Sequence, residues 1–173
     1  PANHSTPLIL AQVVLVSGFY LVVLAAVGGP RLAGWVNRFG PGLADRLAWV
    51  FPWKRLRLQR DFSSVLAILL DAGVPEARAL DLAGGSTANA VMRARAGTAA
   101  ADLPRGAGLA TALRRLDESG EFRWRLENAT RGPAGFRTAL EGWHEVLSAR
   151  AWQLEQTAAQ VATTGLVLLN GLL

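Results

Sequence analysis

The chain has 173 residues, of which 51% are hydrophobic, and its mean hydropathy of +0.24 is high for a soluble protein but low for a polytopic membrane bundle. The absence of cysteine excludes disulfides and thiolate metal sites. The net charge of +5 is unevenly spread, with seven basic residues and one acid in residues 31–60 against eleven basic and twelve acidic residues in residues 61–155. A nucleic-acid-binding protein would carry its positive charge on the folded domain, so this class is disfavoured and no nucleic-acid partner is expected.

The first segment, residues 1–30, carries no Lys, Arg, Asp or Glu. Within it, residues 7–27 are an apolar run interrupted only by Gln12, Ser17 and Tyr20. About 20 apolar residues in a helix cross a hydrocarbon core that is about 30 Å thick. A secretory signal peptide would need a basic start and a shorter apolar core. We therefore predict a transmembrane helix with a short polar lead.

Residues 31–54 are predicted to form a basic, tryptophan-rich linker at the membrane surface, in which the sequence Gly40-Pro41-Gly42 breaks any helix. The basic excess places this side of the first helix in the cytoplasm by the positive-inside rule. Tryptophan suits the headgroup region because its ring is apolar while its N–H needs a polar partner. The alternative is that these tryptophans are core residues of the following domain. The residues assigned to the membrane surface are Arg31, Trp35, Arg38, Trp49, Trp53, Lys54 and Arg55.

Residues 55–155 have the periodicity of helices and no convincing strand pattern. The first helix of this domain is predicted to end near Gly73, which suits the left-handed position after a helix, and Pro75 suits the first turn of the next helix. Asp71 precedes this turn at a helix C-terminus, where a negative charge is mildly unfavourable. We expect Asp71 to pair with a nearby arginine, and the alternative is an acid that binds a partner.

The remaining turns of the domain are predicted from glycine, proline and serine. Residues 84–87, Gly-Gly-Ser-Thr, indicate a break between helices, with Ser86 or Thr87 as the N-cap of a third helix. Further turns are predicted at residues 104–108 and 119–120.

The last helix of the domain is predicted to continue past the last charged residue. Apolar residues recur at steps of three or four from Phe136 to Val161, and the pattern crosses Glu155 without interruption. Residues 156–173 are therefore predicted to start a second transmembrane helix, and we expect the native protein to continue in apolar residues beyond them. The predicted fold is all-α, an antiparallel six-helix cytoplasmic bundle flanked by transmembrane helices.

No group of residues has the spacing of a catalytic, metal or cofactor site. The two histidines, His4 and His144, are far apart and lack metal-ligand neighbours, so His144 is expected to be a surface or partly buried residue. No glycine-rich phosphate loop is present. Acids and arginines are mixed in residues 114–127, as on a solvated helix face. We predict no catalytic residue, no cofactor and no metal, and we do not expect an enzyme.

Two sequence elements resemble those of a known family. The first is Phe62-x-x-x-Leu66-x-x-Leu69-Leu70-x-Ala72-Gly73-Val74-Pro75-x-x-x-Ala79-Leu80, and the second is Gly106-x-x-Leu109-x-x-Ala112-Leu113. They resemble the type II secretion F domain of inner-membrane platform proteins in type II secretion and type IV pilus machines. A third element, residues 132–136, keeps the family's glycines and lacks its acid. The motif residues that the resemblance assigns are Phe62, Leu66, Leu69, Leu70, Gly73, Pro75, Leu80, Gly106, Leu109, Leu113 and Gly135.

The resemblance covers residues 55–173 and implies a non-enzymatic, multi-pass protein of the bacterial inner membrane with residues 55–155 in the cytoplasm. Because the family couples a secretion ATPase to the assembly of pilin-like subunits, it implies as partners the membrane, the ATPase, other inner-membrane platform components and pilin-like subunits. A homo-oligomer is also expected. Family members commonly hold two copies of the domain, and this chain is similar to the second half. The alternatives are a membrane-anchored helical scaffold or sensor unrelated to secretion, and an enzyme embedded in the membrane.

Overall fold

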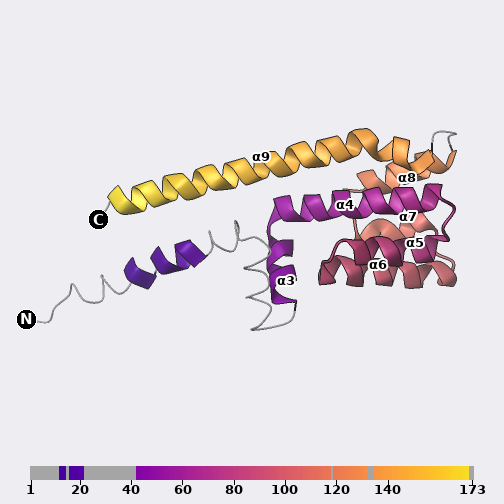
Figure 1. Ribbon diagram of the computed structural model, residues 1–173, viewed down its shortest axis with the longest axis horizontal. Helices are drawn as coiled ribbons and strands as arrows, with labels where there is room; N and C mark the ends of the chain where they lie inside the picture. The colour runs from indigo at the N-terminus through magenta and orange to yellow at the C-terminus, as the bar shows by residue number, and fades with distance from the viewer. Residues whose placement is uncertain (1–11, 15, 22–41, 118, 132–134, 172–173) are drawn as a thin grey trace, which may run out of the picture. The chain divides into compact units, whose positions relative to one another are not determined.

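The fold is helical throughout the part of the chain that the structure describes (Figure 1). This structure is a computed structural model, and it describes residues 12–14, 16–21, 42–117, 119–131 and 135–171. Those residues contain no strand, so the predicted all-α class is confirmed. The six-helix bundle is not confirmed, and the fourth expected helix is reduced to the four-residue α7, Leu109–Ala112, followed by the 3-10 turn η2, Leu113–Arg115.

The chain divides into two compact units. One unit, which we call the helical unit, is Trp49–Leu154, and the other combines residues 1–48 with residues 155–173. Helices α3, Leu43–Val50, and α9, Gly135–Gly171, each contribute residues to both units. The helical unit contains all of α4 to α8 and carries the candidate site.

The turn between α4, Pro52–Asp71, and α5, Glu76–Ser86, has the form that the sequence predicts. Gly73 adopts a φ of +76°, a left-handed conformation that glycine tolerates because it has no Cβ. The N–H groups of Gly73 and of the next residue donate to the carbonyls of Leu70 and Leu69, each over 3.0 Å. These bonds satisfy the last carbonyls of α4. The predicted helix end at this glycine is confirmed.

The predicted break and N-cap between α5 and α6, Ala90–Asp102, are wrong in detail. Helix α5 continues through both glycines to Ser86, and the hydroxyls of Ser86 and Thr87 donate back to carbonyls three residues earlier, over 2.8 and 2.9 Å. These hydroxyls therefore end α5 and do not begin α6. The cap of α6 is Asn89, whose side-chain oxygen accepts from the N–H of Met92 at 3.0 Å.

The chain from α6 to α8, Glu121–Arg131, turns twice at glycine. The 3-10 turn η1, Leu103–Arg105, ends at Gly106, which has a φ of +90°. Gly120, with a φ of +74°, lies directly before α8. Both turns fall where the sequence predicts them, because glycine is the residue that a left-handed backbone favours.

Helix α9 is a single α-helix of 37 residues, about 55 Å long at 1.5 Å per residue. This confirms the predicted continuity of the last domain helix beyond Glu155. Its first half buries Leu140, Trp143, Leu147 and Ala151 in the helical unit.

No helix in the described segments combines the length and the apolar character that a membrane span needs. Most of the predicted first span, residues 7–27, lies outside those segments, which include only residues 12–14 and 16–21 of it.

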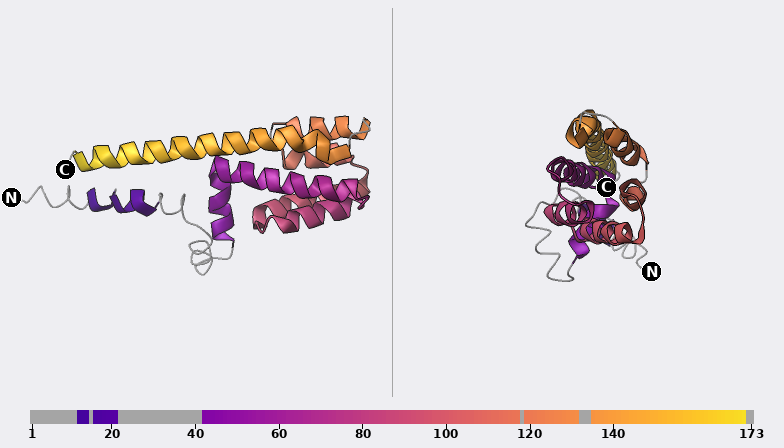
Figure 2. Two further views of the ribbon diagram at one scale, coloured as in Figure 1. Left: turned by 45° about the horizontal axis from the view of Figure 1, so that its top comes forward. Right: turned by 90° about the vertical axis from the view of Figure 1, so that its right-hand side faces the viewer.

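An aromatic cluster lies at the centre of the helical unit. The ring of Phe62 on α4 meets Phe122 on α8 edge to face at 6.4 Å, and Phe122 stacks on Trp143 of α9 at 5.1 Å. Both geometries are favourable for aromatic pairs, so they join three helices. The end-on view in Figure 2 shows the helices of this unit grouped around a shared interior. Further buried core residues are Leu66, Ala67, Ala79, Leu80, Ala83, Met92, Ala96, Ala99, Leu113, Leu126 and Leu140.

Candidate functional site

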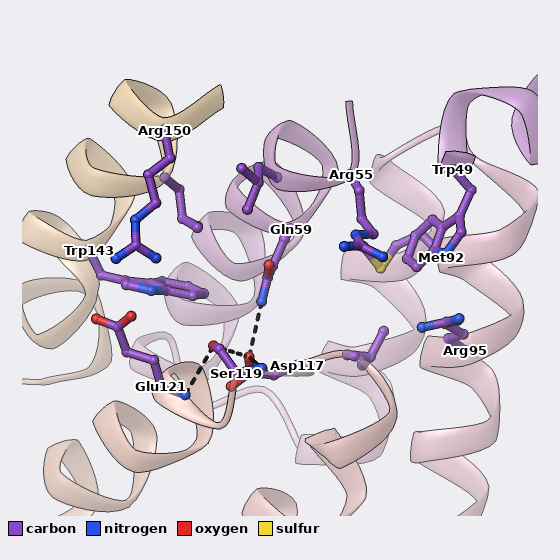
Figure 3. A pocket seen from close by; sticks show the side chains of 13 residues that line it. Trp49, Arg55, Gln59, Met92, Arg95, Asp117, Ser119, Glu121, Trp143 and Arg150 are labelled. Carbon is purple, nitrogen blue, oxygen red and sulfur yellow. Dashed lines mark hydrogen bonds between the residues drawn. The ribbon is translucent and has the colours of Figure 1, made fainter. Parts of the chain in front are cut away.

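A pocket of about 330 Å³ lies in the helical unit, lined by residues of α3, α4, α6, α8 and α9 and of the turn before α8 (Figure 3). Helix α4 contributes Arg55, Leu56 and Gln59, which a helix places on neighbouring positions of one face. The apolar part of the lining is Trp49, Leu56, Met92, Leu116, Trp143 and Leu147. The polar part is Arg55, Gln59, Arg95, Asp117, Ser119, Glu121 and Arg150.

Asp117 organises the turn at one side of the pocket. Its side chain is 5% exposed, and its two oxygens accept from the backbone N–H groups of Ser119, Phe122 and Arg123 at 3.0, 2.7 and 3.3 Å. The Ser119 hydroxyl and the Gln59 amide also donate to it, over 2.6 and 3.4 Å (Figure 3). A carboxylate at a helix N-terminus satisfies N–H groups that have no partner within the helix. Asp117 therefore caps α8 and ties this turn to α4.

This position of Asp117 corrects the expectation of a solvated charged face. The sequence contained a signal for it, since Asp117 and Ser119 precede a helix that begins with Glu121.

Three arginines reach the pocket from three different helices, as Figure 3 shows: Arg55 from α4, Arg95 from α6 and Arg150 from α9. The guanidinium of Arg95 lies over the ring of Trp49, 4.3 Å from its centroid. A cation over a tryptophan ring is attracted by the ring quadrupole, which holds Arg95 at the edge of the pocket. Arg55 and Trp49 were predicted to lie at the membrane surface, and Arg95 and Arg150 were not predicted to have a role. No local sequence pattern indicates that these three helices meet around one pocket.

The acidic lining residue Glu121 forms an ion pair with an arginine that does not line the pocket. Its carboxylate accepts from Arg125, one helical turn away, at 3.0 Å. Such pairs of residues four apart lie side by side on a helix.

The motif residues are distributed through the core and the turns and do not form one surface. Phe62, Leu66, Leu80 and Leu113 are almost fully buried, Leu109 is 8% exposed, and Leu69 and Leu70 are half-buried. Gly73, Gly106 and Gly135 have φ between +74° and +90°, and Pro75 directly precedes α5. The apolar motif residues therefore pack in or against the core, and the glycines and the proline fit the backbone conformations of the turns.

Asp71 caps α9, which corrects the expected pairing with an arginine. Its carboxylate accepts from the backbone N–H groups of Phe136 and Arg137 at 2.8 and 3.0 Å. A Cβ on Gly135 would lie 3.0 Å from one of these oxygens, so glycine leaves room for the carboxylate. The acid that the resemblance led us to expect in this turn is absent from the local sequence, but a carboxylate reaches the start of α9 from the end of α4. Asp71 and Gly135 lie 64 positions apart in the sequence, which explains why no local pattern could indicate this contact.

Two of the tryptophans assigned to the membrane surface belong to the helical unit. Trp53 is 8% exposed, and its ring lies 4.9 Å from that of Phe51, while Trp49 is half-buried against Arg95. Burial of Trp53 argues against its placement among headgroups and fits the alternative of a core residue. Lys54 lies 5.3 Å from the ring of Phe51. The other residues of that set, Arg31, Trp35 and Arg38, lie outside the described segments.

His144 joins α9 to α4 and is half-buried, in line with the predicted surface or partly buried position. Its Nε2 lies 2.9 Å from the hydroxyl of the fully buried Ser63, which donates to the carbonyl of Arg60 at 3.0 Å. Arg60 also donates to Ser148 at 3.2 Å. Burial, together with the Arg60 guanidinium, lowers the pKa of His144, and Asp61 offsets part of this.

No cluster of His, Asp and Glu able to hold a metal ion occurs in the part of the chain that the structure describes.

The chain matches a known protein family over part of its length. Residues 62–131 match the model of the T2SSF family, described as "Type II secretion system (T2SS), protein F". This segment is therefore similar to the T2SSF domain. No curated protein and no solved structure matches the chain. The match confirms the resemblance to the type II secretion F domain, and it runs from the first motif residue, Phe62, to the end of α8.

T2SSF proteins are generally non-catalytic platform proteins of secretion systems, typically of the inner membrane. The matched segment includes the Asp71 turn, the α5–α6 pair and Asp117, whereas Arg55 and Arg150 of the pocket lie on either side of it.

Proposed function

We propose that this chain is a non-enzymatic inner-membrane platform protein of a type II secretion or type IV pilus-like system. In this role it couples a cytoplasmic secretion ATPase to the assembly of pilin-like subunits and to protein export. The observation that carries the proposal is the T2SSF match at residues 62–131, followed by α9, which continues as one helix to Gly171. A continuous helix transmits displacement better than a loop because its backbone hydrogen bonds keep its length fixed.

The proposed topology has membrane spans beginning in residues 1–30 and 156–173, a surface linker at residues 31–54 and a cytoplasmic domain at residues 55–155. The basic excess in residues 31–60 supports this orientation. Large apolar side chains are exposed on residues 13–21 and on the part of α9 that follows the helical unit, which supports contact with lipid or with other membrane proteins. These exposed residues are Val13, Val14, Leu21, Val161, Val167 and Leu168.

The proposed partners are the secretion ATPase, other platform components, pilin-like subunits and further copies of this chain. Affinity purification of the full chain from detergent-solubilised membranes tests this set, with mass spectrometry as the readout. We expect a hexameric ATPase and pilin-like proteins to co-purify. Recovery of neither from cells that produce both would favour a membrane-anchored scaffold or sensor unrelated to secretion.

Movement through α9 is tested by a pair of matched variants at Gln156 and Thr157, which follow the helical unit. Replacing both by glycine weakens the helix by about 1 kcal/mol per residue, whereas replacing both by alanine keeps it rigid. Neither variant changes the length or register of the helix. We expect export, measured as secreted protein in the medium, to fall in the glycine variant and to persist in the alanine variant. Equal export by both variants, at equal protein levels, would contradict transmission through α9.

A further inference from the structure

We propose that a second copy of this chain binds at a cavity beside the start of α8 and contacts it with Glu141 and Glu145 of its own α9. The cavity has a volume of about 330 Å³ and lies at the turn between η2 and α8. The inference rests on the proposed function in one respect, since further copies of this chain belong to the proposed partners. The residues that line the cavity are Arg114, Asp117, Ser119, Gly120 and Arg123.

This cavity presents two guanidinium groups that have no acidic partner. The side chains of Arg114 and Arg123 make no hydrogen bond, ion pair or ring contact within the described part of the chain. The carboxylate of Asp117 accepts from the Gln59 amide, from the Ser119 hydroxyl and from backbone N–H groups, and it forms no ion pair with either arginine. Because two like charges around one cavity repel each other, the site favours a negatively charged group from another molecule.

Helix α9 carries two acids that also lack a partner. Glu141 and Glu145 are exposed, and neither makes a hydrogen bond or an ion pair among the residues that the structure describes. Residues four apart lie side by side on a helix, and like charges at this spacing destabilise it. A guanidinium group binds a carboxylate through parallel N–H donors. The chain therefore carries both halves of a complementary contact, on two different helices.

Each half also has an exposed apolar side chain next to its charge. Trp124 follows Arg123 and is 60% exposed, and Val146 follows Glu145 and is 39% exposed. Tryptophan and arginine are the residue types that contribute most to binding energy in protein interfaces. An occupant that covers both the cavity and Trp124 must be larger than a free anion, which favours a protein surface.

The position of the two halves allows a symmetric pair of copies. Helices α8 and α9 lie beside each other, joined by a side-chain hydrogen bond of 3.4 Å (Figure 1). In a two-fold interface the same patch serves both copies, so the contact between the arginines and the acids would form twice.

Charge reversal in mixed proteins tests the contact. Arg123→Glu and Glu145→Arg each place like charges opposite one another when the variant associates with itself. The full chain is purified in detergent, labelled at the N-terminus with a donor or an acceptor fluorophore, and its self-association is followed by energy transfer. We expect the Kd of each variant to rise about tenfold, since like charges across an interface oppose binding. An equal mixture of the two variants brings opposite charges together at both contacts, and its Kd should return close to that of the wild type.

The matched control is Arg78→Glu, which reverses the charge of an exposed arginine on α5 outside the cavity. It should retain the Kd of the wild type. Recovery in the mixture also excludes misfolding, because two damaged folds would not restore each other. The proposal is overturned if the full chain does not self-associate, if Arg123→Glu and Arg78→Glu weaken association equally, or if the mixture associates no better than its components. Co-purification of the secretion ATPase is measured separately, and its failure would count against the proposed function and not against this contact.

Discussion

Helices α5 and α6 meet through small apolar groups, whereas α4 and α9 are joined by hydrogen bonds. A Cβ on the buried Gly84 of α5 would lie only 2.7 Å from the Cβ of Ala96 on α6, so these backbones are in close approach. Between α4 and α9, the contacts are Ser63 with His144, Arg60 with Ser148, and Asp71 with the start of α9. The contact between α5 and α6 depends on shape. The direct hydrogen bonds between α4 and α9 use polar groups, several of which reach solvent, and they lie beside the buried aromatic cluster that joins both helices to α8.

This difference suits a unit in which one helix moves relative to a rigid remainder. Close-packed interiors change little without a large energy cost, whereas polar contacts near water can be exchanged for water at a small net cost. Under the proposed function, α9 is the helix that must respond to a partner. The α5–α6 pair would then serve as the stable part of the unit.

Asp117→Ala should have the largest effect on stability, because the polar contacts that it removes are buried. The substitution removes the cap of α8 and leaves buried N–H groups without an acceptor, which we expect to cost roughly 2–4 kcal/mol of unfolding free energy. Urea unfolding of the full chain, followed by tryptophan fluorescence, measures the change. Asp117→Asn keeps an acceptor and should lose less. A loss of unfolding free energy below roughly 0.5 kcal/mol is the level of a neutral surface substitution. Such a result would show that burial does not make this polar contact strong.

Gly84→Ala tests the apolar pair, and Gly85→Ala is its matched control. The added methyl at residue 84 must displace α6, and overpacking typically costs about 1–3 kcal/mol. At residue 85 nothing lies within 4 Å of the new Cβ, so alanine should stabilise the helix by roughly 0.5–1 kcal/mol. Opposite signs in the same unfolding assay are expected. Equal effects would mean that the two helices do not depend on this close approach.

Asp71→Ala should have a smaller effect, about 0.5–2 kcal/mol for the loss of a helix cap, because its carboxylate is exposed. Asp81→Ala removes the same charge from an exposed position on α5 and controls for net charge. Hydrogen exchange at the N–H groups of Phe136 and Arg137 gives a local readout. Faster exchange should occur there in Asp71→Ala alone, and unchanged exchange would contradict the cap.

The two helix pairs also differ in how far the sequence predicts them. The end of α4 at Gly73 and the continuity of α9 followed from local rules, because glycine conformation and apolar periodicity are properties of short segments. The caps at Asn89 and Asp71 did not follow, since several residues near the first could cap a helix and the second acts across 65 residues of chain. The pocket arginines were missed for the same reason, because they converge only when α4, α6 and α9 pack.

The smallest effect concerns pH and the contact between His144 and Ser63. Burial and Arg60 lower the pKa of His144 in the folded chain, so near pH 6 the unfolded chain binds more protons than the folded one. The stability associated with the neutral ring is therefore complete above the unfolded value of about 6.5 and declines as the pH falls toward the lower folded pKa. Because the ring is only about half buried, solvent screens part of the effect.

His144→Gln isolates this contribution, because glutamine retains a polar side chain and does not titrate. Unfolding free energies are compared at pH 7.5 and pH 5.5 for both proteins. Between pH 7.5 and pH 5.5, the unfolding free energy of the wild type should fall by more than that of the variant. Above pH 7, the unfolding free energies of both proteins should depend on pH in the same way. A wild type that becomes more stable at pH 5.5 relative to the variant would mean that the pKa of His144 is raised, and that the α4–α9 contacts favour the charged ring. In that case acid would strengthen the contact between α4 and α9, where the lowered pKa predicts that acid weakens it.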